Sequence, residues 1–289
     1  MNILITALFS CLAIATPVRR VDYESDTSNH MDDVIAGTKQ CASNAVMFGR
    51  ETWAPGNIGV LLGARFRNEL LETFDGDVDV QGIHRDDYPA NLQDYHIGGS
   101  DTGADSCAKT IDDYAALCPN TKIFVSGYSQ GSLVAYKCVN RVGDAARKQI
   151  KSLVVFGTEE ALMDDAQPVP QGVILKSYCV ENTTAPDVVC TKTLTSGIKL
   201  PSSGEEVVTQ LKETIAALGA VATNQDQQKE IASLPGLLLA DLPATLPWIT
   251  KDILQGKVRR WTILPPHLLY GFNGMTTDAA EWMAKVTAQ

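Results

Sequence analysis

Residues 122–131 read KIFVSGYSQG, and the last five of them, Gly127–Gly131, form the pattern G-x-S-x-G. The β-rich run Lys122–Ser126 precedes this pattern, and helical periodicity follows it over about Ser132–Val142. A serine between a strand and a helix in this way lies on the sharp turn called a nucleophile elbow. Glycines flank it because the turn would crowd a β-carbon. The stretch therefore predicts that Ser129 is a nucleophile held at the end of a strand.

The alternation of strands and helices continues on both sides of this stretch. Four further runs have the length and composition of strands: Asn44–Phe48, Asp77–Ile83, Leu153–Phe156 and Val173–Tyr178. Between the second and third of these runs, Asp101–Leu117 has the periodicity of a helix. Strands that alternate with helices favour a parallel sheet with helices on both faces. We therefore expect an α/β fold.

Residues 191–266 interrupt this rhythm. Ser203 and Glu206 form a capping box, which predicts that a helix begins there. An apolar helical stripe follows and stops before Gly219; its members are Val207, Val208, Leu211, Ile215 and Leu218. These features do not fit the core sheet, so they indicate an inserted helix.

A second apolar stretch within the same region, Leu234–Ile249, contains three prolines that predict breaks in it, namely Pro235, Pro243 and Pro247. We expect a helical subdomain inserted at about residues 195–260. Its position stays open between a cap over the predicted nucleophile and a decoration packed to one side.

The composition is that of an ordinary globular protein, with 45% hydrophobic and 20% charged residues. The 289 residues suit one large α/β domain or two small ones. A net charge of −10 argues against nucleic-acid partners, whose backbone is bound by an excess of Lys and Arg. No segment beyond the N-terminus reads as apolar for long enough to cross a membrane. We expect no nucleic-acid partner, no stable membrane insertion and a monomer.

The N-terminus has the pattern of a secretory signal. The apolar run Ile3–Ala15 is too short to span a bilayer and ends in an A-x-A cleavage pattern. We expect a signal peptide over residues 1–16. The polar and charged residues 17–40 predict a mobile N-terminal arm.

The number of cysteines also indicates that the protein is exported. Without Cys11 of the signal, the chain keeps an even number of cysteines, which suggests disulfides in an exported protein. No pair has C-x-x-C spacing, and no histidine lies close to a cysteine, so a zinc site is not expected. We expect a secreted, extracellular protein.

The base that would activate Ser129 follows from elimination. In α/β-hydrolases the chain order is Ser, then Asp or Glu, then His, and His267 is the one histidine after Ser129. A serine hydroxyl needs such a base because it is otherwise a poor nucleophile. Spacing alone does not choose the third member among Asp144, Asp164, Asp165 and Asp187.

Further short motifs run from Cys41 to near the C-terminus: Phe48–Thr52, Gly56–Gly59, Cys118-Pro119, Val155–Gly157, Cys179, Asp187–Thr191 and Pro266–Gly271. Together with GYSQG they resemble the cutinases and acetylxylan esterases of the α/β-hydrolase class. The D-x-V-C-T and P-H-L-x-Y-G motifs are more similar to cutinases. The inserted residues lie outside this resemblance.

The resemblance implies a fold and an activity. The fold is a three-layer α/β/α sandwich with a mainly parallel central sheet, here over residues 41–289 and interrupted by the insertion. The activity is that of a secreted serine carboxylester hydrolase acting through an acyl-enzyme, on a cutin-like polyester or a smaller acyl ester. The resemblance implies no metal and no organic cofactor.

The resemblance also implies roles for individual residues. Asp187 matches the family's triad aspartate and would orient His267. Thr52 matches the oxyanion-hole hydroxyl residue, and Gln130 supplies a backbone N–H after the nucleophile. Disulfides Cys41–Cys118 and Cys179–Cys190 are implied, and Cys107 with Cys138 is left by subtraction.

Two features depart from the family pattern. Glu51 stands beside Thr52 where the family usually has glycine, and an inward-pointing anion would oppose the negative charge that develops on the substrate. A left-handed backbone at Glu51 would also cost about 1–2 kcal/mol. Asp187 and His267 lie much further apart in the chain than is usual, although long loops add little closure entropy.

Two alternatives stay open beside a cutinase. The first is an acetylxylan esterase, which has the same machinery and a sugar acetate as substrate. The second is an inactive secreted binding protein on the same fold.

Overall fold

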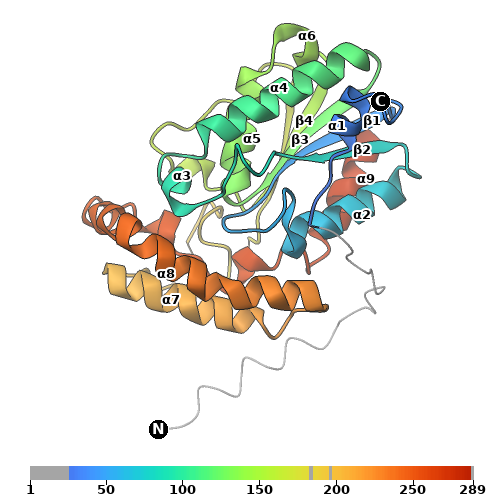
Figure 1. Cartoon of the computed structure of the whole chain (residues 1–289). Coiled ribbons are helices and arrows are strands. Elements are labelled where there is room, and N and C mark those ends of the chain that lie inside the picture. Colours follow the sequence, from blue (N-terminus) through green and yellow to red (C-terminus); the bar gives the residue numbers. More distant parts are fainter. Residues whose placement is uncertain (1–25, 182–184, 195–196, 288–289) are drawn as a thin grey trace.

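The computed structural model describes residues 26–181, 185–194 and 197–287 (Figure 1). Its centre is a sheet of five parallel strands in the order β2 (Val78–Gly82), β1 (Asn44–Gly49), β3 (Lys122–Tyr128), β4 (Ile150–Phe156) and β5 (Ile174–Tyr178). The predicted α/β fold with a parallel sheet is therefore confirmed.

Helices cover both faces of this sheet. One face carries α1 (His30–Ile35), α4 (Asp101–Leu117) and α5 (Gln130–Arg141), and the other carries α2 (Ala64–Thr73) and α9 (Met275–Thr287). Successive side chains of a strand point to opposite faces. In β1, Ala45 and Met47 accordingly belong to one core, and Val46 and Phe48 belong to the other. Because both faces are covered, the three central strands β1, β3 and β4 are buried along nearly their whole length.

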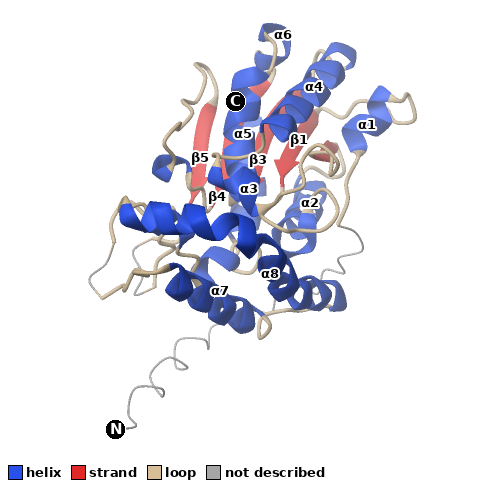
Figure 2. Cartoon of the chain, turned by 60° about the vertical axis from the view of Figure 1, so that its left-hand side comes forward, coloured by secondary structure: helices blue, strands red, loops and turns tan. Residues whose placement is uncertain are grey.

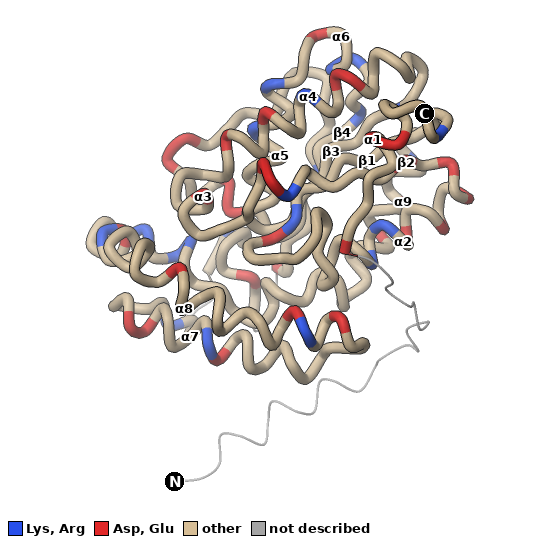
Figure 3. The backbone as a smooth tube through the Cα atoms, viewed as in Figure 1, with Lys and Arg blue, Asp and Glu red and all other residues tan. Residues whose placement is uncertain are grey.

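The remaining elements are short connecting helices, apart from the two helices of the insertion. They are η1 (Gly59–Gly63), α3 (Leu92–His96), α6 (Asp144–Arg147), η2 (Glu160–Leu162), η3 (Val258–Trp261) and η4 (Pro265–Leu268). In the view of Figure 3, the described part of the chain shows acidic and basic residues interspersed, without a continuous basic stripe.

Residues 26–40 do not form the mobile arm that the sequence predicted. Met31 and Val34 of α1 are buried in the core, and Ser28 Oγ donates a hydrogen bond of 2.7 Å to the carbonyl of Val80. An isolated bridge pairs Asn29 with Gln81 of the edge strand β2. The polar side chains of this segment therefore serve pairing with an edge strand, which needs such cover. The predicted signal peptide and residues 17–25 lie outside the described residues.

The insertion contains two long helices, α7 (Gly204–Leu218) and α8 (Gln225–Leu254), which lie side by side (Figure 2). The predicted start of α7 is confirmed, because the Ser203 side chain accepts a hydrogen bond of 3.2 Å from the backbone N–H of Glu206.

The prediction that prolines break the second apolar stretch is wrong. All three prolines lie inside the continuous helix α8, and each has an exposed side chain. On the solvent side of a helix, water can bond the carbonyls that lose their N–H partner, and a bend there curves the helix around the core. The prolines are tolerated because they lie on that side.

By length and composition alone, α8 could also cross a membrane, which the sequence analysis did not expect. Its buried side chains, among them Leu234, Leu238 and Ile249, pack on the rest of the protein. Core helices of soluble proteins have the same composition, so this finding does not by itself indicate a span.

Three disulfides join the pairs expected for the six cysteines: Cys41–Cys118, Cys107–Cys138 and Cys179–Cys190. The first ties the segment before β1 to the end of α4, and the second ties α4 to α5. The third closes the loop that carries Asp187, and Cys190 Sγ lies 3.3 Å from Asp187 Oδ2.

We predict that the disulfide Cys41–Cys118 contributes mainly to stability and that Cys179–Cys190 contributes mainly to activity. The denatured-state entropy removed by a crosslink is worth about 4.5 kcal/mol for the separation of 77 residues and about 3 kcal/mol for that of 11. Cys41→Ala/Cys118→Ala should therefore lose more of the free energy of unfolding, and Cys179→Ala/Cys190→Ala more of the ester-hydrolysing activity that the sequence predicts. Denaturant titration and ester hydrolysis measure the two effects. Equal loss of activity in both double variants would contradict the role given to the second loop.

Candidate active site

Ser129 lies on a strained turn between β3 and α5. Its φ of 52° and ψ of −128° are unfavourable for a residue with a side chain, at a cost of about 1–3 kcal/mol. A β-carbon on Gly127 would lie 2.3 Å from the carbonyl oxygen of Gly131, and one on Gly131 would lie 2.1 Å from that of Gly49. This close backbone approach requires the two glycines. The turn has the geometry that the G-x-S-x-G pattern predicts.

His267 contacts both other residues of the expected triad. Its Nε2 lies 2.9 Å from Ser129 Oγ, and its Nδ1 lies 2.9 Å from Asp187 Oδ2. The helix η4 carries His267 to this place, and Tyr128 Oη donates a hydrogen bond to its backbone carbonyl. Ser129 is 7% exposed, His267 1% and Asp187 0%, so the whole constellation is shielded from water.

Asp187 is held as an anion by its neighbours. Burial raises its pKa, but the charge of His267 and hydrogen bonds from His267, Tyr270 Oη (2.6 Å) and the backbone N–H of Val189 (3.2 Å) lower the pKa below its usual value. Burial lowers the pKa of His267. The charges of Asp187, Glu159 and Glu51 and the hydrogen bond to Asp187 act in the opposite direction, and the pKa of His267 is raised overall. The pair thus favours an imidazole that readily takes up a proton at Nε2.

The other three aspartates considered from the sequence are not brought to this site. Asp144, Asp164 and Asp165 are exposed, and Asp164 pairs with Lys257 at 2.7 Å. The structure therefore brings together Ser129, Asp187 and His267, as the family resemblance implied.

Thr52 and Gln130 lie next to each other beside Ser129. Thr52 Oγ1 donates a hydrogen bond of 3.1 Å to Gln130 Oε1, and Gln130 Nε2 donates one of 2.8 Å to the carbonyl of Asn91. Gln130 is the first residue of α5, so its backbone N–H has no acceptor within the helix. A backbone N–H at a helix start and a neighbouring hydroxyl are donors of the kind that can bind a negatively charged oxygen. The backbone of Glu51 is not left-handed, so the strain expected there is absent, and Trp53 adopts a φ of 64° instead.

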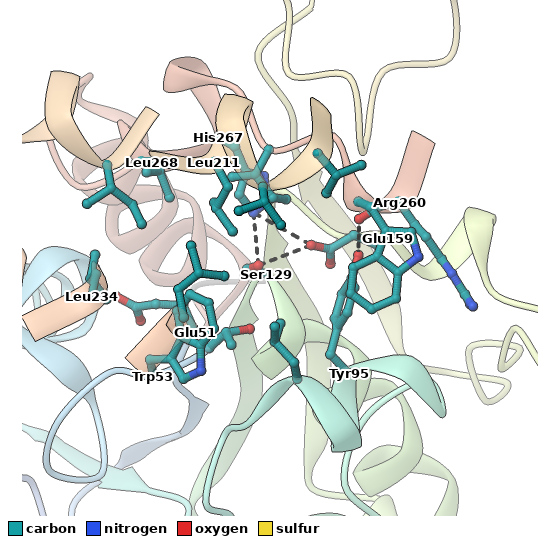
Figure 4. A pocket seen from close by; sticks show the side chains of 18 of the residues that line it. Glu51, Trp53, Tyr95, Ser129, Glu159, Leu211, Leu234, Arg260, His267 and Leu268 are labelled. Carbon is teal, nitrogen blue, oxygen red and sulfur yellow. Dashed lines mark hydrogen bonds and ion pairs between the residues drawn. The ribbon is translucent and has the colours of Figure 1, made fainter. Parts of the chain in front are cut away.

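An apolar cavity of about 90 Å³ lies over the triad. Its floor includes Ser129, Tyr128 and His267, and its roof comes from α7 and α8 through Val207, Leu211, Ile215, Leu234, Leu238 and Leu242. Figure 4 shows Leu211, Leu234 and Leu268 around the space next to Ser129. The insertion therefore covers the site and is not packed to one side.

Three buried glutamates also line this cavity, namely Glu51, Glu159 and Glu230. Glu159 Oε1 accepts a hydrogen bond of 3.1 Å from Ser129 Oγ and lies 3.6 Å from His267 Nε2 (Figure 4). Burial, together with the charge of Asp187, raises the pKa of Glu159 to about 7 against the opposing effect of His267. Glu159 is thus a second carboxyl group in contact with Ser129 and close to His267.

The sequence analysis missed Glu159, although a signal for it exists. It lies three residues beyond the end of β4, the strand next to β3. The carboxyl ends of parallel strands meet at one edge of the sheet, where ligands bind in open α/β folds. A carboxyl group soon after Val155–Gly157 is therefore expected near Ser129.

Comparison with known proteins identifies the family of this chain. A family model described as cutinase matches residues 40–206, which is more than half of the chain. The chain belongs to the cutinase family. It is accordingly a serine carboxylic-ester hydrolase.

The relatives of this esterase include named cutinases. It is 34% identical over 201 residues to cutinase 3 of Emericella nidulans, covering 67% of this chain and 86% of that protein. It is 32% identical over 150 residues to cutinase CUT1 of Coprinopsis cinerea, covering 52% of this chain and 71% of the relative. A structure of Trichoderma reesei cutinase with a phosphonate inhibitor matches 74% of this chain and 80% of its own, at 25% identity and a TM-score of 0.46.

We predict that Glu159 sets the acid limb of the pH–activity profile. Whenever Glu159 is ionised, its charge raises the pKa of the imidazole, so replacing it with glutamine lets neutral His267 persist to lower pH. Glu159→Gln should therefore shift the acid limb of kcat/KM toward lower pH. The matched control is Glu160→Gln, since burial also raises the pKa of Glu160 to about 7 but its carboxylate bonds the N–H of Gln167 outside the cavity. Identical acid limbs for wild type and Glu159→Gln would contradict this assignment.

Proposed function

We propose that this cutinase-family enzyme is a secreted carboxylester hydrolase whose catalytic triad is Ser129, His267 and Asp187. The observation that carries the proposal is the position of His267, within hydrogen-bond distance of both Ser129 Oγ and Asp187 Oδ2. Export is supported by the three disulfides and by the A-x-A pattern near the N-terminus.

The first half of the reaction forms an acyl-enzyme. Ser129 Oγ attacks the ester carbonyl carbon while its proton passes to His267 Nε2. Asp187 orients the imidazole and stabilises the resulting imidazolium. The Thr52 hydroxyl and the Gln130 N–H stabilise the negative oxygen of the tetrahedral intermediate. When the intermediate collapses, the C–O bond to the alcohol breaks, and His267 protonates the departing oxygen.

The second half of the reaction releases the acid. A water molecule gives a proton to His267 Nε2 and attacks the acyl carbonyl carbon. Thr52 and Gln130 again hold the negative oxygen. The bond to Ser129 then breaks, Oγ recovers its proton from His267, and the carboxylic acid leaves.

We further propose that α7 and α8 form a lid that selects the acyl chain. Helices of the insertion supply the roof of the cavity, and its volume is small at about 90 Å³. A substrate must therefore displace or open the roof, as in enzymes whose lids exclude water. This arrangement favours esters with flexible chains over a solid polyester, and the leucine-rich lining favours an acyl chain over a sugar acetate.

The triad assignment predicts the behaviour of four variants. Ser129→Ala and His267→Ala should lose kcat by about 10⁴-fold or more, and Asp187→Asn should lose much of it because the imidazole takes the wrong tautomer. Hydrolysis of a p-nitrophenyl ester measures this, and circular dichroism checks folding. Asp165→Asn, an exposed aspartate of the same region, is the control and should match wild type. Near-normal turnover in Ser129→Ala or His267→Ala would rule the mechanism out.

The lid proposal predicts a contrast between two adjacent leucines of α8. Leu238 is 1% exposed and lines the cavity, whereas Leu239 is 58% exposed on the outside of the same helix. Leu238→Ala enlarges the cavity, so its ratio of kcat/KM for a long-chain ester to that for an acetate should rise severalfold. Leu239→Ala should leave this ratio unchanged. If both variants change the ratio alike, or neither does, α8 does not shape the acyl site.

A further inference from the structure

Each of the three glutamates in the cavity has at least one carboxyl oxygen without a hydrogen-bond partner among the described residues, and Glu159 uses its other oxygen to contact Ser129. Glu51 is 6% exposed, and neither of its side-chain oxygens meets a partner of normal geometry among the described residues. Glu230 of α8 is 5% exposed, and its Oε1 is likewise without a partner. Buried carboxyl groups without partners are costly, so a binding role accounts for them better than a structural one.

The two carboxyl groups act on one another. Burial raises the pKa of Glu51 to about 7, against the lowering effects of its own backbone N–H and of Arg50. Burial raises the pKa of Glu230 further above its usual value, and the charge of Glu51 adds to this; the N–H of Val60 and Arg50 oppose it. Two close carboxyl groups in an apolar site do not ionise together. Near neutral pH, at least one of them is therefore a neutral acid that can both donate and accept a hydrogen bond.

A structural role explains only one of these four oxygens. Glu230 Oε2 accepts a hydrogen bond of 3.2 Å from the backbone N–H of Val60, near the start of η1. The other three side-chain oxygens of the pair have no such use. A metal does not account for them either, because the described residues contain no group of three or more His, Cys, Asp or Glu placed to hold one.

The surroundings define what would satisfy these oxygens. The cavity that contains them also contains Ser129 and is otherwise lined largely by leucines such as Leu61, Leu234 and Leu268. The occupant must therefore be an apolar chain that reaches the nucleophile and carries a hydrogen-bond donor. A neutral donor fits better than a cation, because Arg50 is buried beside Glu51.

We propose that Glu51 and Glu230 form a polar subsite that binds a hydroxyl group on the chain of the ester substrate. This inference rests on the proposed function and names its substrate class: esters whose chain bears a hydroxyl. Because Glu230 belongs to α8, the bound hydroxyl would also link the substrate to the lid.

The test compares p-nitrophenyl esters of equal chain length that end in a methyl or a hydroxymethyl group. Wild type should prefer the hydroxylated ester by roughly tenfold or more in kcat/KM, since a site built for a hydroxyl rejects the analogue that lacks it. Glu51→Leu and Glu230→Leu should each abolish this preference. The control, Glu160→Gln, removes a buried carboxyl group outside the cavity and should keep it.

Binding to inactive protein separates this inference from the proposed function. Ser129→Ala should bind the intact hydroxylated ester roughly tenfold more tightly than the plain one in calorimetry, and Ser129→Ala/Glu51→Ala, which removes the carboxyl group, should lose most of this difference. This second pair keeps the test valid if a leucine variant does not fold.

Several outcomes would overturn the subsite. They are equal kcat/KM for the two esters in wild type, an unchanged preference in both glutamate variants, or a stronger preference for an ester ending in an amine. If wild-type protein hydrolyses neither ester, the proposed function is refuted instead. The calorimetric comparison would then still decide whether the subsite binds a hydroxyl group.

Discussion

The buried hydrogen bond between His267 Nδ1 and Asp187 Oδ2 joins two loops that lie 80 residues apart in the chain. Nearly all of the insertion lies between these residues, so both of its ends must return to the carboxyl edge of the sheet. Closing such a long loop costs little more entropy than closing a short one. The fixed ends explain why α7 and α8 lie over Ser129: they leave and re-enter the domain beside the triad.

Because α7 and α8 cover the site, they change its electrostatics. With Ser129 and His267 almost fully buried, each charge there acts through a medium of low dielectric constant. Asp187 is compensated by His267 and by hydrogen bonds, whereas Glu51 and Glu159 meet few such groups and have raised pKa values near 7. Uncharged glutamates oppose the oxyanion less than charged ones. Glu51 therefore repels the negative oxygen of the intermediate less when the lid is closed and the pH is neutral or lower.

The sequence predicts best what depends on neighbouring residues. The strand, turn and helix around Ser129 follow from their own glycines and apolar runs, and His267 follows from being the one histidine after Ser129. Spacing could not choose Asp187 from its rivals, because that choice depends on how distant loops meet, and only the family resemblance pointed to it. The sequence did not predict that α8 is continuous, because the energetic cost of a proline inside a helix depends on whether that side of the helix faces water. Glu159 and Glu230 were missed because their chemistry arises from long-range burial.

The most direct test of this account is to find where a reactive phosphonate attaches. The protein is incubated with a fluorophosphonate ester, digested, and mapped by mass spectrometry. The account predicts a single adduct on the Ser129 hydroxyl, formed at a rate that falls sharply in His267→Ala. An adduct on another residue, or none in folded wild-type protein, would contradict the claim that Ser129 is the nucleophile activated by His267 and Asp187.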